Sequence, residues 1–173
     1  MNVLVLGVGN ILMGDEGIGT RAIELLERRY RFPENVELLD GGTSGIELLR
    51  FIEDREHLIL IDAIKGGQPP GTVVRVDGED VPARFRTRIS PHQLGISDLL
   101  ATAQLTGSVP PNLVLFGIEP KDVLMKLEMS PEVEASMDRL AELVVEELRS
   151  IGCIIERQET DLPDRHTHWK PVG

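Results

Sequence analysis

Short uninterrupted runs of hydrophobic residues alternate with stretches of helical spacing along most of the chain. The uninterrupted apolar run at 3–6 is typical of a strand buried on both faces, and 58–61 is the most apolar strand of the chain. Residues 36–39 predict a second short strand, 112–120 another buried strand, and 72–76 alternates like a half-exposed strand. Apolar residues three or four positions apart predict helices that begin at residue 18 and that cover 46–52, 91–106 and 131–151. We expect residues 77–90 to form an irregular loop.

This order of elements predicts an α/β domain with three layers, α/β/α, in which helices cover both faces of a mostly parallel sheet. We expect one domain over residues 1–152, followed by a polar, peripheral tail over residues 153–173. Ligands bind such sheets beyond the carboxyl ends of the strands, so the candidate functional residues should lie there.

Composition and charge exclude several classes of partner and compartment. The 173 residues carry 18 Lys and Arg against 29 Asp and Glu, a formal charge of −11, which disfavours nucleic acid or an anionic membrane as partner. The single cysteine, Cys153, excludes an internal disulfide and suits a reducing compartment. No segment has the pattern of a signal peptide or the length of a membrane span. We therefore expect a cytoplasmic protein without membrane insertion.

Polar and flexible residues follow three of the predicted strands. The stretch 7–16 follows the first strand, Asp40-Gly41-Gly42-Thr43 the second, and Asp62 the third. His92 falls in the first turn of a helix that Ser90 and Pro91 would begin. In a parallel sheet these four stretches converge at the end of the sheet where the strands have their carboxyl ends.

The glycine-rich turn at 7–9 suggests a dinucleotide site, with Asp40 as the ribose-binding acid. However, Leu12 stands where the third glycine of that fingerprint belongs, and Asp15 and Glu16 lie where a pyrophosphate needs free amides. Two unit charges ~4 Å apart repel by roughly 4 kcal/mol at an effective dielectric of ~20, more than the ~1 kcal/mol of a helix dipole. A dinucleotide-binding protein is thus the weakest alternative.

A cation suits these residues better. Glu16, Asp62 and His92 supply two carboxylates and one imidazole, a set suited to a first-row divalent metal. A helix N-terminus disfavours imidazolium, so we expect His92 to stay neutral and able to bind metal. Each residue alone has a simpler interpretation: a helix-capping acid, a carboxylate that accepts backbone amides, and a surface histidine. The metal hypothesis depends on their joint placement.

Four motifs, "LGVGNILMGDEGIG", "DGGTSG", "ILIDAI" and "SPHQLG", resemble those of the nickel-dependent hydrogenase maturation endopeptidases, in the same order over residues 2–150. These enzymes remove a short C-terminal extension from the large-subunit precursor of a [NiFe] hydrogenase. The resemblance implies that Glu16, Asp62 and His92 bind nickel, which the precursor carries. It also places Asp40 and the candidate substrate-binding residues Gly41, Gly42 and Thr43 near that site.

The same resemblance implies a phosphorylase/hydrolase-like fold, with a five-stranded, mostly parallel sheet in which 72–76 is the one antiparallel strand. Asp40 or Asp62 is the candidate general base, and glycines at 7, 9, 41 and 42 would let the peptide backbone approach closely. A nickel-binding maturation chaperone without catalytic activity would use the same three metal ligands and stays open as an alternative.

Other reactive side chains carry less weight. Cys153 lies beyond the last predicted helix, and we expect a structural thiol rather than a nucleophile. His166 and His168 could chelate a metal, but a solvated pair in the tail is the simpler interpretation.

Overall fold

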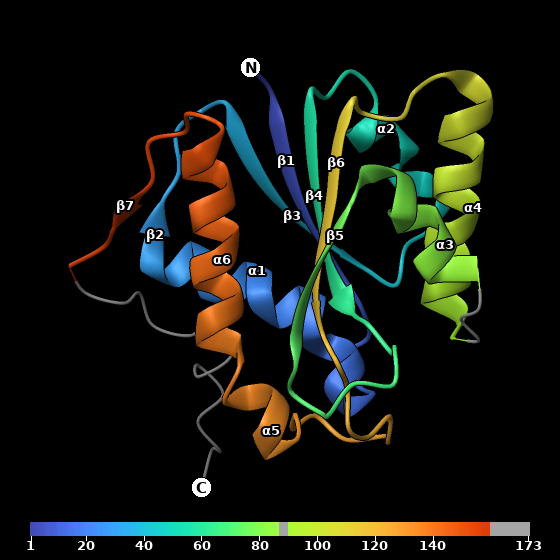
Figure 1. Cartoon of the computed structure of the whole chain (residues 1–173), viewed down its shortest axis with the longest axis vertical. Helices are drawn as coiled ribbons and strands as arrows, with labels where there is room; N and C mark the ends of the chain where they lie inside the picture. The colour runs from blue at the N-terminus through green and yellow to red at the C-terminus, as the bar shows by residue number, and fades with distance from the viewer. Residues whose placement is uncertain (87–89, 160–173) are drawn as a thin grey trace, which may run out of the picture.

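The computed structural model describes residues 1–86 and 90–159, and its centre is a five-stranded sheet (Figure 1). The strands are β1 (Val3–Val8), β3 (Val36–Gly42), β4 (His57–Ala63), β5 (Val73–Asp77) and β6 (Asn112–Ile118), in the order β3-β1-β4-β6-β5. β5 runs antiparallel to β6, and the other neighbours are parallel. The predicted mostly parallel sheet with one antiparallel strand is confirmed.

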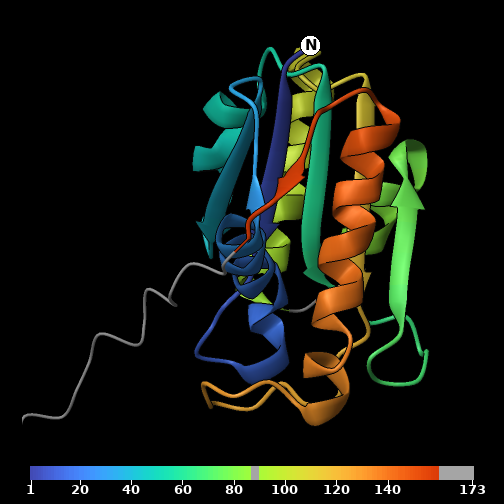
Figure 2. The same ribbon diagram turned by 90° about the vertical axis from the view of Figure 1, so that its left-hand side faces the viewer.

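Helices cover both faces of this sheet (Figures 1 and 2). One face carries α1 (Ile18–Arg29) and α6 (Met137–Ser150), and the other carries α2 (Leu49–Ile52), α3 (Val81–Arg86) and α4 (Pro91–Thr106). The predicted three-layer arrangement is therefore present. In the described part of the chain, no helix combines the length and the apolar character that a membrane crossing requires.

The two hydrophobic cores explain why β1 and residues 58–61 of β4 are apolar without interruption. Val3 and Val5 of β1 pack on the α1 and α6 side, whereas Leu4 and Leu6 pack on the α4 side. Because successive side chains of a strand point to opposite faces, a strand covered on both faces needs apolar residues at every position.

Two predicted boundaries were wrong. Residues 77–90 are not simply a loop, because a 3-10 turn, η3 (Gly78–Asp80), leads into α3, whose Val81 and Phe85 are buried one turn apart. The single helix predicted at 131–151 is two helices, α5 (Pro131–Glu134) and α6. Ser136 lies between them, and its hydroxyl donates a hydrogen bond of 2.6 Å to the carbonyl of Gly71.

The end of the domain also differs from the predicted boundary at residue 153. Cys153 and Ile155 are buried in the core beside α1 and α6. Strand β7 (Glu156–Arg157) pairs antiparallel with β2 (Tyr30–Arg31), and the amide of the Gln158 side chain donates to the carbonyls of Glu27 and Tyr30. The fold therefore includes residues up to about 158. His166 and His168 lie outside the described residues.

Candidate active site

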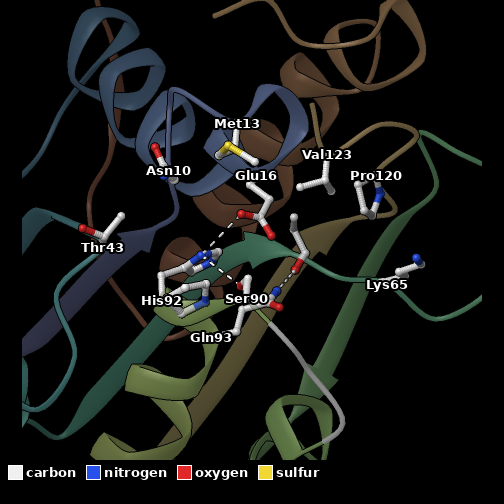
Figure 3. Close-up of a pocket in the computed structure, with 12 residues that line it drawn as sticks. Asn10, Met13, Glu16, Thr43, Lys65, Ser90, His92, Gln93, Pro120 and Val123 are labelled. Atoms are coloured by element: carbon white, nitrogen blue, oxygen red, sulfur yellow. Dashed lines mark hydrogen bonds and ion pairs between the residues drawn. The ribbon is translucent and has the colours of Figure 1, made fainter. Parts of the chain in front are cut away.

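A cavity of about 920 Å³ opens at the carboxyl ends of β1 and β4, at the end of the sheet opposite the N-terminus (Figures 1 and 3). Five segments contribute to its wall: the turn after β1, the loop after β3, the end of β4 with the residues that follow it, the start of α4 and the segment after β6. The lining residues are Asn10, Met13, Glu16, Thr43, Ala63, Lys65, Ser90, Pro91, His92, Gln93, Pro120 and Val123. The convergence of the first four segments was predicted, three of them from their places at strand ends and the fourth, with His92, from its place at the start of a helix.

The glycines at 7 and 9, in and just after the end of β1, are required for packing within the chain rather than for contact with a peptide. A Cβ atom on Gly7 would lie 2.2 Å from the carbonyl oxygen of Gly19, in α1. Gly9 has φ of +149°, and a Cβ atom there would lie 2.0 Å from the carbonyl oxygen of Glu16. Since both positions are filled by the backbone of the chain itself, the prediction that they make room for substrate is not supported.

Asp15 and Glu16 lie in the 3-10 turn η1 (Gly14–Gly17), which precedes α1, and both are buried. The Asp15 carboxylate accepts hydrogen bonds from the backbone amides of Lys121, Asp122 and Ser130 and from the Ser130 hydroxyl, at 2.7–3.2 Å. Glu16 points instead toward His92 across the cavity (Figure 3). Only Glu16 is therefore available to a ligand.

Burial raises the pKa of Asp15, but the hydrogen bonds from Ser130, Lys121 and Asp122 outweigh this effect and hold the pKa below its ordinary value. Asp15 is accordingly ionised at neutral pH, and it anchors the segment after β6 against η1.

His92 connects the two carboxylates that the sequence singled out. Its Nε2 lies 3.3 Å from Oδ1 of Asp62, and its Nδ1 lies 3.7 Å from Oε2 of Glu16 and 3.1 Å from the Ser90 hydroxyl. His92 is 3% exposed and Asp62 is fully buried. We place the ring proton of the neutral form on Nε2, because Asp62 then accepts it and Nδ1 accepts from Ser90.

Ser90 was expected to cap α4, and its side chain forms no capping hydrogen bond. Its hydroxyl contacts His92 instead. In the sequence, the one sign of this contact was that Ser90 lies two residues before the candidate ligand His92. Whether such a serine contacts the histidine depends on the turn that brings the two side chains together.

The electrostatics of His92 differ from the expectation based on the helix dipole. Burial lowers the pKa of His92, but the hydrogen bond and charge of Asp62, together with the charge of Glu16, outweigh burial and raise the pKa above its ordinary value. Burial raises the pKa of Asp62, against the opposing effect of His92. Both shifts favour retention of a proton by the pair, so a metal ion that binds His92 must compete with that proton.

Glu16, Asp62 and His92 are chemically suited to bind a metal ion, but their side chains are not arranged around one. Oδ2 of Asp62 is buried and has no hydrogen-bond partner within the described residues, a costly arrangement that a cation would relieve. However, no three His, Cys, Asp or Glu side chains of residues 1–86 and 90–159 surround a common point. The imidazole separates the two carboxylates, so the side chains must rearrange before all three can bind one ion.

Of residues 40–43, at the end of β3, only Thr43 belongs to the cavity wall. Thr43 lines the cavity, whereas Asp40, Gly41 and Gly42 are not among its lining residues. Oδ1 of Asp40 accepts hydrogen bonds of 2.9 Å from the Thr20 hydroxyl and the Gly42 amide, and Asp40 is exposed. A Cβ atom on Gly41 would contact core leucines at 2.9–3.1 Å, which indicates a packing role.

Lys65, Pro120 and Val123 line the cavity and were not singled out from the sequence. Glu119, buried at the end of β6, accepts hydrogen bonds from the amides of Gly66 at 2.7 Å and Gly67 at 3.2 Å, and so fixes the turn that follows Lys65. An acid directly after a buried strand is the signal that identified Asp62, and it would have identified Glu119 as well.

Comparison with known proteins gives a consistent result. The family model described as "Hydrogenase maturation protease" matches residues 20–147. The chain is 47% identical to the hydrogenase 2 maturation protease of Escherichia coli (strain K12), over 88% of this chain and 93% of that protein. It is 40% identical to the hydrogenase expression/formation protein HoxM of Azotobacter vinelandii, over 82% of this chain and 73% of that protein. The solved structure of the hydrogenase maturating endopeptidase HybD from E. coli superposes with a TM-score of 0.88 at 45% identity, over 91% of this chain and 98% of that chain.

Proposed function

This chain belongs to the hydrogenase maturation protease family, and from that premise we propose that it removes a short C-terminal extension from the nickel-loaded large-subunit precursor of a [NiFe] hydrogenase. The proposed substrate is the precursor protein together with the nickel that it carries. The observation that supports this proposal best is the buried Oδ2 of Asp62, which has no hydrogen-bond partner within the described residues and lies behind His92, while His92 and Glu16 line the cavity.

We assign Glu16, Asp62 and His92 to the nickel of the precursor. Glu16 and Nδ1 of His92 lie on the cavity side, and Asp62 holds the opposite edge of the imidazole. Nickel bound there would act as a Lewis acid that polarises the scissile carbonyl or lowers the pKa of a water molecule. The contribution of the chain is to fix the metal, and thereby the adjoining peptide bond, within the cavity.

Two carboxylates remain candidates for the general base, and their surroundings differ. Asp62 is fully buried and reaches the cavity only through His92. Asp40 is exposed, and within the described residues its Oδ2 takes part in no hydrogen bond. A general base must reach the attacking water. Neither carboxylate lines the cavity, so Asp40, whose other oxygen is held by Thr20 and the amide of Gly42, and Asp62 both stay candidates for the base. Thr43, which does line the cavity, is the proposed contact to the peptide.

Incubation of the chain with a nickel-loaded large-subunit precursor, followed by mass spectrometry of the precursor, tests the activity. We expect loss of one short C-terminal peptide. A nickel-binding chaperone would leave the precursor mass unchanged, so the product distinguishes the two functions. A dinucleotide-binding protein is not supported, because buried acids precede α1 where a pyrophosphate would need free amides.

The source of the metal can be tested in the same assay. Two carboxylates and one imidazole that do not surround a common point should bind nickel weakly without further ligands. We expect metal-free precursor to resist cleavage, and chelator treatment of the enzyme before mixing to leave cleavage of the nickel-loaded precursor intact. Efficient cleavage of metal-free precursor by an enzyme with its own tightly bound zinc would contradict a metal supplied by the substrate.

A further inference from the structure

Exposed apolar side chains gather beside the cavity, on two segments far apart in the sequence. Leu12 is 57%, Val123 44%, Leu124 57% and Met125 87% exposed, and Met13 next to Leu12 is partly exposed. We call these five residues the rim patch. Soluble proteins seldom present several large apolar side chains together unless the surface binds a partner.

The two segments of the rim patch are held together by backbone hydrogen bonds. The amide of Gly14 donates to the carbonyl of Lys126 at 2.8 Å, and Met13 pairs with Lys126 as an isolated parallel bridge. Asp15 fastens both ends of the segment 121–130 through the four hydrogen bonds described above. A surface that is fixed before binding loses little conformational entropy on binding, so the rim patch is prepared for a partner.

The rim patch continues into the cavity. Met13 and Val123 line the cavity wall, and Figure 3 shows both beside Glu16. A polypeptide that brings its scissile bond to Glu16 and His92 must leave the cavity over its rim, and the rim patch occupies part of that rim. The substrate that is cut is therefore the partner best placed to cover it.

The two lysines around the rim patch are paired with carboxylates. The Lys121 ammonium lies 2.6 Å from the Glu132 carboxylate, and the Lys126 ammonium lies 4.0 Å from the Asp122 carboxylate. The surface accordingly offers mainly apolar contact, with both lysines paired and Glu128 as the exposed acid beside it, and binding to it should depend weakly on ionic strength.

We propose that the rim patch binds an apolar segment of the same precursor protein, next to the extension that is removed. The inference rests on the proposed function, because it takes the hydrogenase large-subunit precursor as the occupant. The rim patch then supplies affinity for the protein substrate, while Glu16, Asp62 and His92 act at its metal. The two contributions separate experimentally, since a patch residue affects binding and not the reacting atoms.

The test is the variant Leu124→Asp/Met125→Asp, assayed with the nickel-loaded precursor. A charge placed against an apolar partner should lower kcat/KM by about tenfold or more, as loss of a central interface contact does, and binding measured by biolayer interferometry should weaken equally. The single-turnover rate at saturating enzyme should stay at the wild-type value. The matched control is Leu105→Asp at the end of α4, since Leu105 is 89% exposed and Met125 87%. The control should leave both quantities unchanged.

Wild-type kcat/KM and affinity in the double variant would overturn the inference, and so would an equal loss in Leu105→Asp. A patch variant that changes the oligomeric state in analytical ultracentrifugation would assign the surface to a second copy of the chain instead. If the double variant does not fold, Met125→Gln is judged by the same criteria. Failure of the wild-type protein to cut the precursor concerns the proposed function alone, because the binding measurement still compares wild type with variant.

Discussion

Asp15 and Glu16 are consecutive residues with unrelated tasks. Asp15 is satisfied by four hydrogen bonds from the segment after β6, whereas Glu16 lines the cavity and faces Nδ1 of His92 at 3.7 Å. Consecutive side chains in the tight turn η1 point in different directions. Asp15 therefore anchors the fold, whereas Glu16 is free to bind a ligand in the cavity. Mutations at the two positions should therefore have different effects.

At the candidate metal ligands we expect loss of processing by at least about 100-fold for Glu16→Gln, Asp62→Asn and His92→Ala, since each removes a proposed ligand. Glu16→Gln is the cleanest of the three, because the polar contact found for the Glu16 side chain among the described residues is the 3.7 Å approach to His92. His92→Ala should also lower the free energy of unfolding by about 3 kcal/mol, because Asp62 would lose its buried partner.

Processing is measured as the fraction of shortened precursor, and the fold by circular dichroism. Glu79→Gln, an exposed acid in η3, serves as the matched control and should retain full activity. Full activity of Glu16→Gln would remove Glu16 from the proposed ligands.

The pH dependence of stability provides a test of Asp15. Its pKa is lowered in the folded state, so its contribution is fully present above the unfolded pKa of about 3.9 and is lost as the pH falls through the lower folded pKa. Asp15→Asn should therefore lower the free energy of unfolding by about 2–4 kcal/mol at pH 6, as expected for hydrogen bonds to a buried charge. This difference should shrink below about pH 4 in urea titrations. A difference that does not change with pH would show that shape, not charge, is what matters at this position.

Cys153 should not take part in catalysis. It is buried between the sheet and the α1 and α6 layer, and burial raises the pKa of its thiol, which keeps the thiolate scarce at neutral pH. Iodoacetamide should label native protein far more slowly than urea-unfolded protein, and Cys153→Ala should process precursor at the wild-type rate. Rapid labelling that abolishes processing would contradict this assignment.

Among the elements, α1 is the one that sets the shape of the site. It crosses β1 and β4 so closely that a Cβ atom on Gly19 would lie 2.1 Å from the carbonyl oxygen of Val8 and 2.3 Å from that of Ile61. This contact fixes where η1 sits and therefore where Glu16 meets His92. The glycine-rich opening of the sequence is explained by helix packing rather than by phosphate binding.

Gly19→Ala should accordingly destabilise the fold. The added methyl group meets backbone atoms that cannot move away singly, so we expect a loss of about 3 kcal/mol or more in the free energy of unfolding. Gly66→Ala is the control, since the nearest atoms to its Cβ position are side-chain atoms at 3.7 Å, and it should change stability by no more than about 0.5 kcal/mol. Chemical denaturation of both variants decides the point, and equal stabilities would show that α1 can shift freely.

On the scale of the whole molecule, residues 153–158 close the layer of α1 and α6. A chain that ends at Gly152 loses the buried side chains of Cys153 and Ile155 and the β2–β7 pair, and we expect it to be less stable by about 3–5 kcal/mol. A chain that ends at Glu159 keeps these contacts and those of Gln158, so it should unfold and process precursor like the full chain. Thermal unfolding and the cleavage assay compare the three chains. A large loss on removal of 160–173 would assign those residues a role in the fold or in binding.

The order of strands and helices was predictable because burial imposes a hydrophobic period on each segment by itself. The apolar runs of β1 and β4, and the helical spacing of α4 with its start at Pro91 and its end at Thr106, needed only local information. The antiparallel direction of β5 came from resemblance to a known family, since a strand reads the same in either direction. The division of α5 from α6 was not predicted, and the hydrogen bond found at that break, from Ser136 to Gly71, joins segments 65 residues apart.

By itself, the sequence determined the α/β class and the end of the sheet at which the candidate active site lies. It also identified Glu16, Asp62 and His92 as the residues that meet there. Only the tertiary structure decided how these side chains face one another, that carboxylates raise the pKa of His92 against the effect of burial, and that Asp15 anchors the segment after β6. The physical reason is range. Hydrophobic periodicity acts between neighbours along the chain, whereas hydrogen bonds and charges act between atoms that only the folded chain brings within a few ångströms.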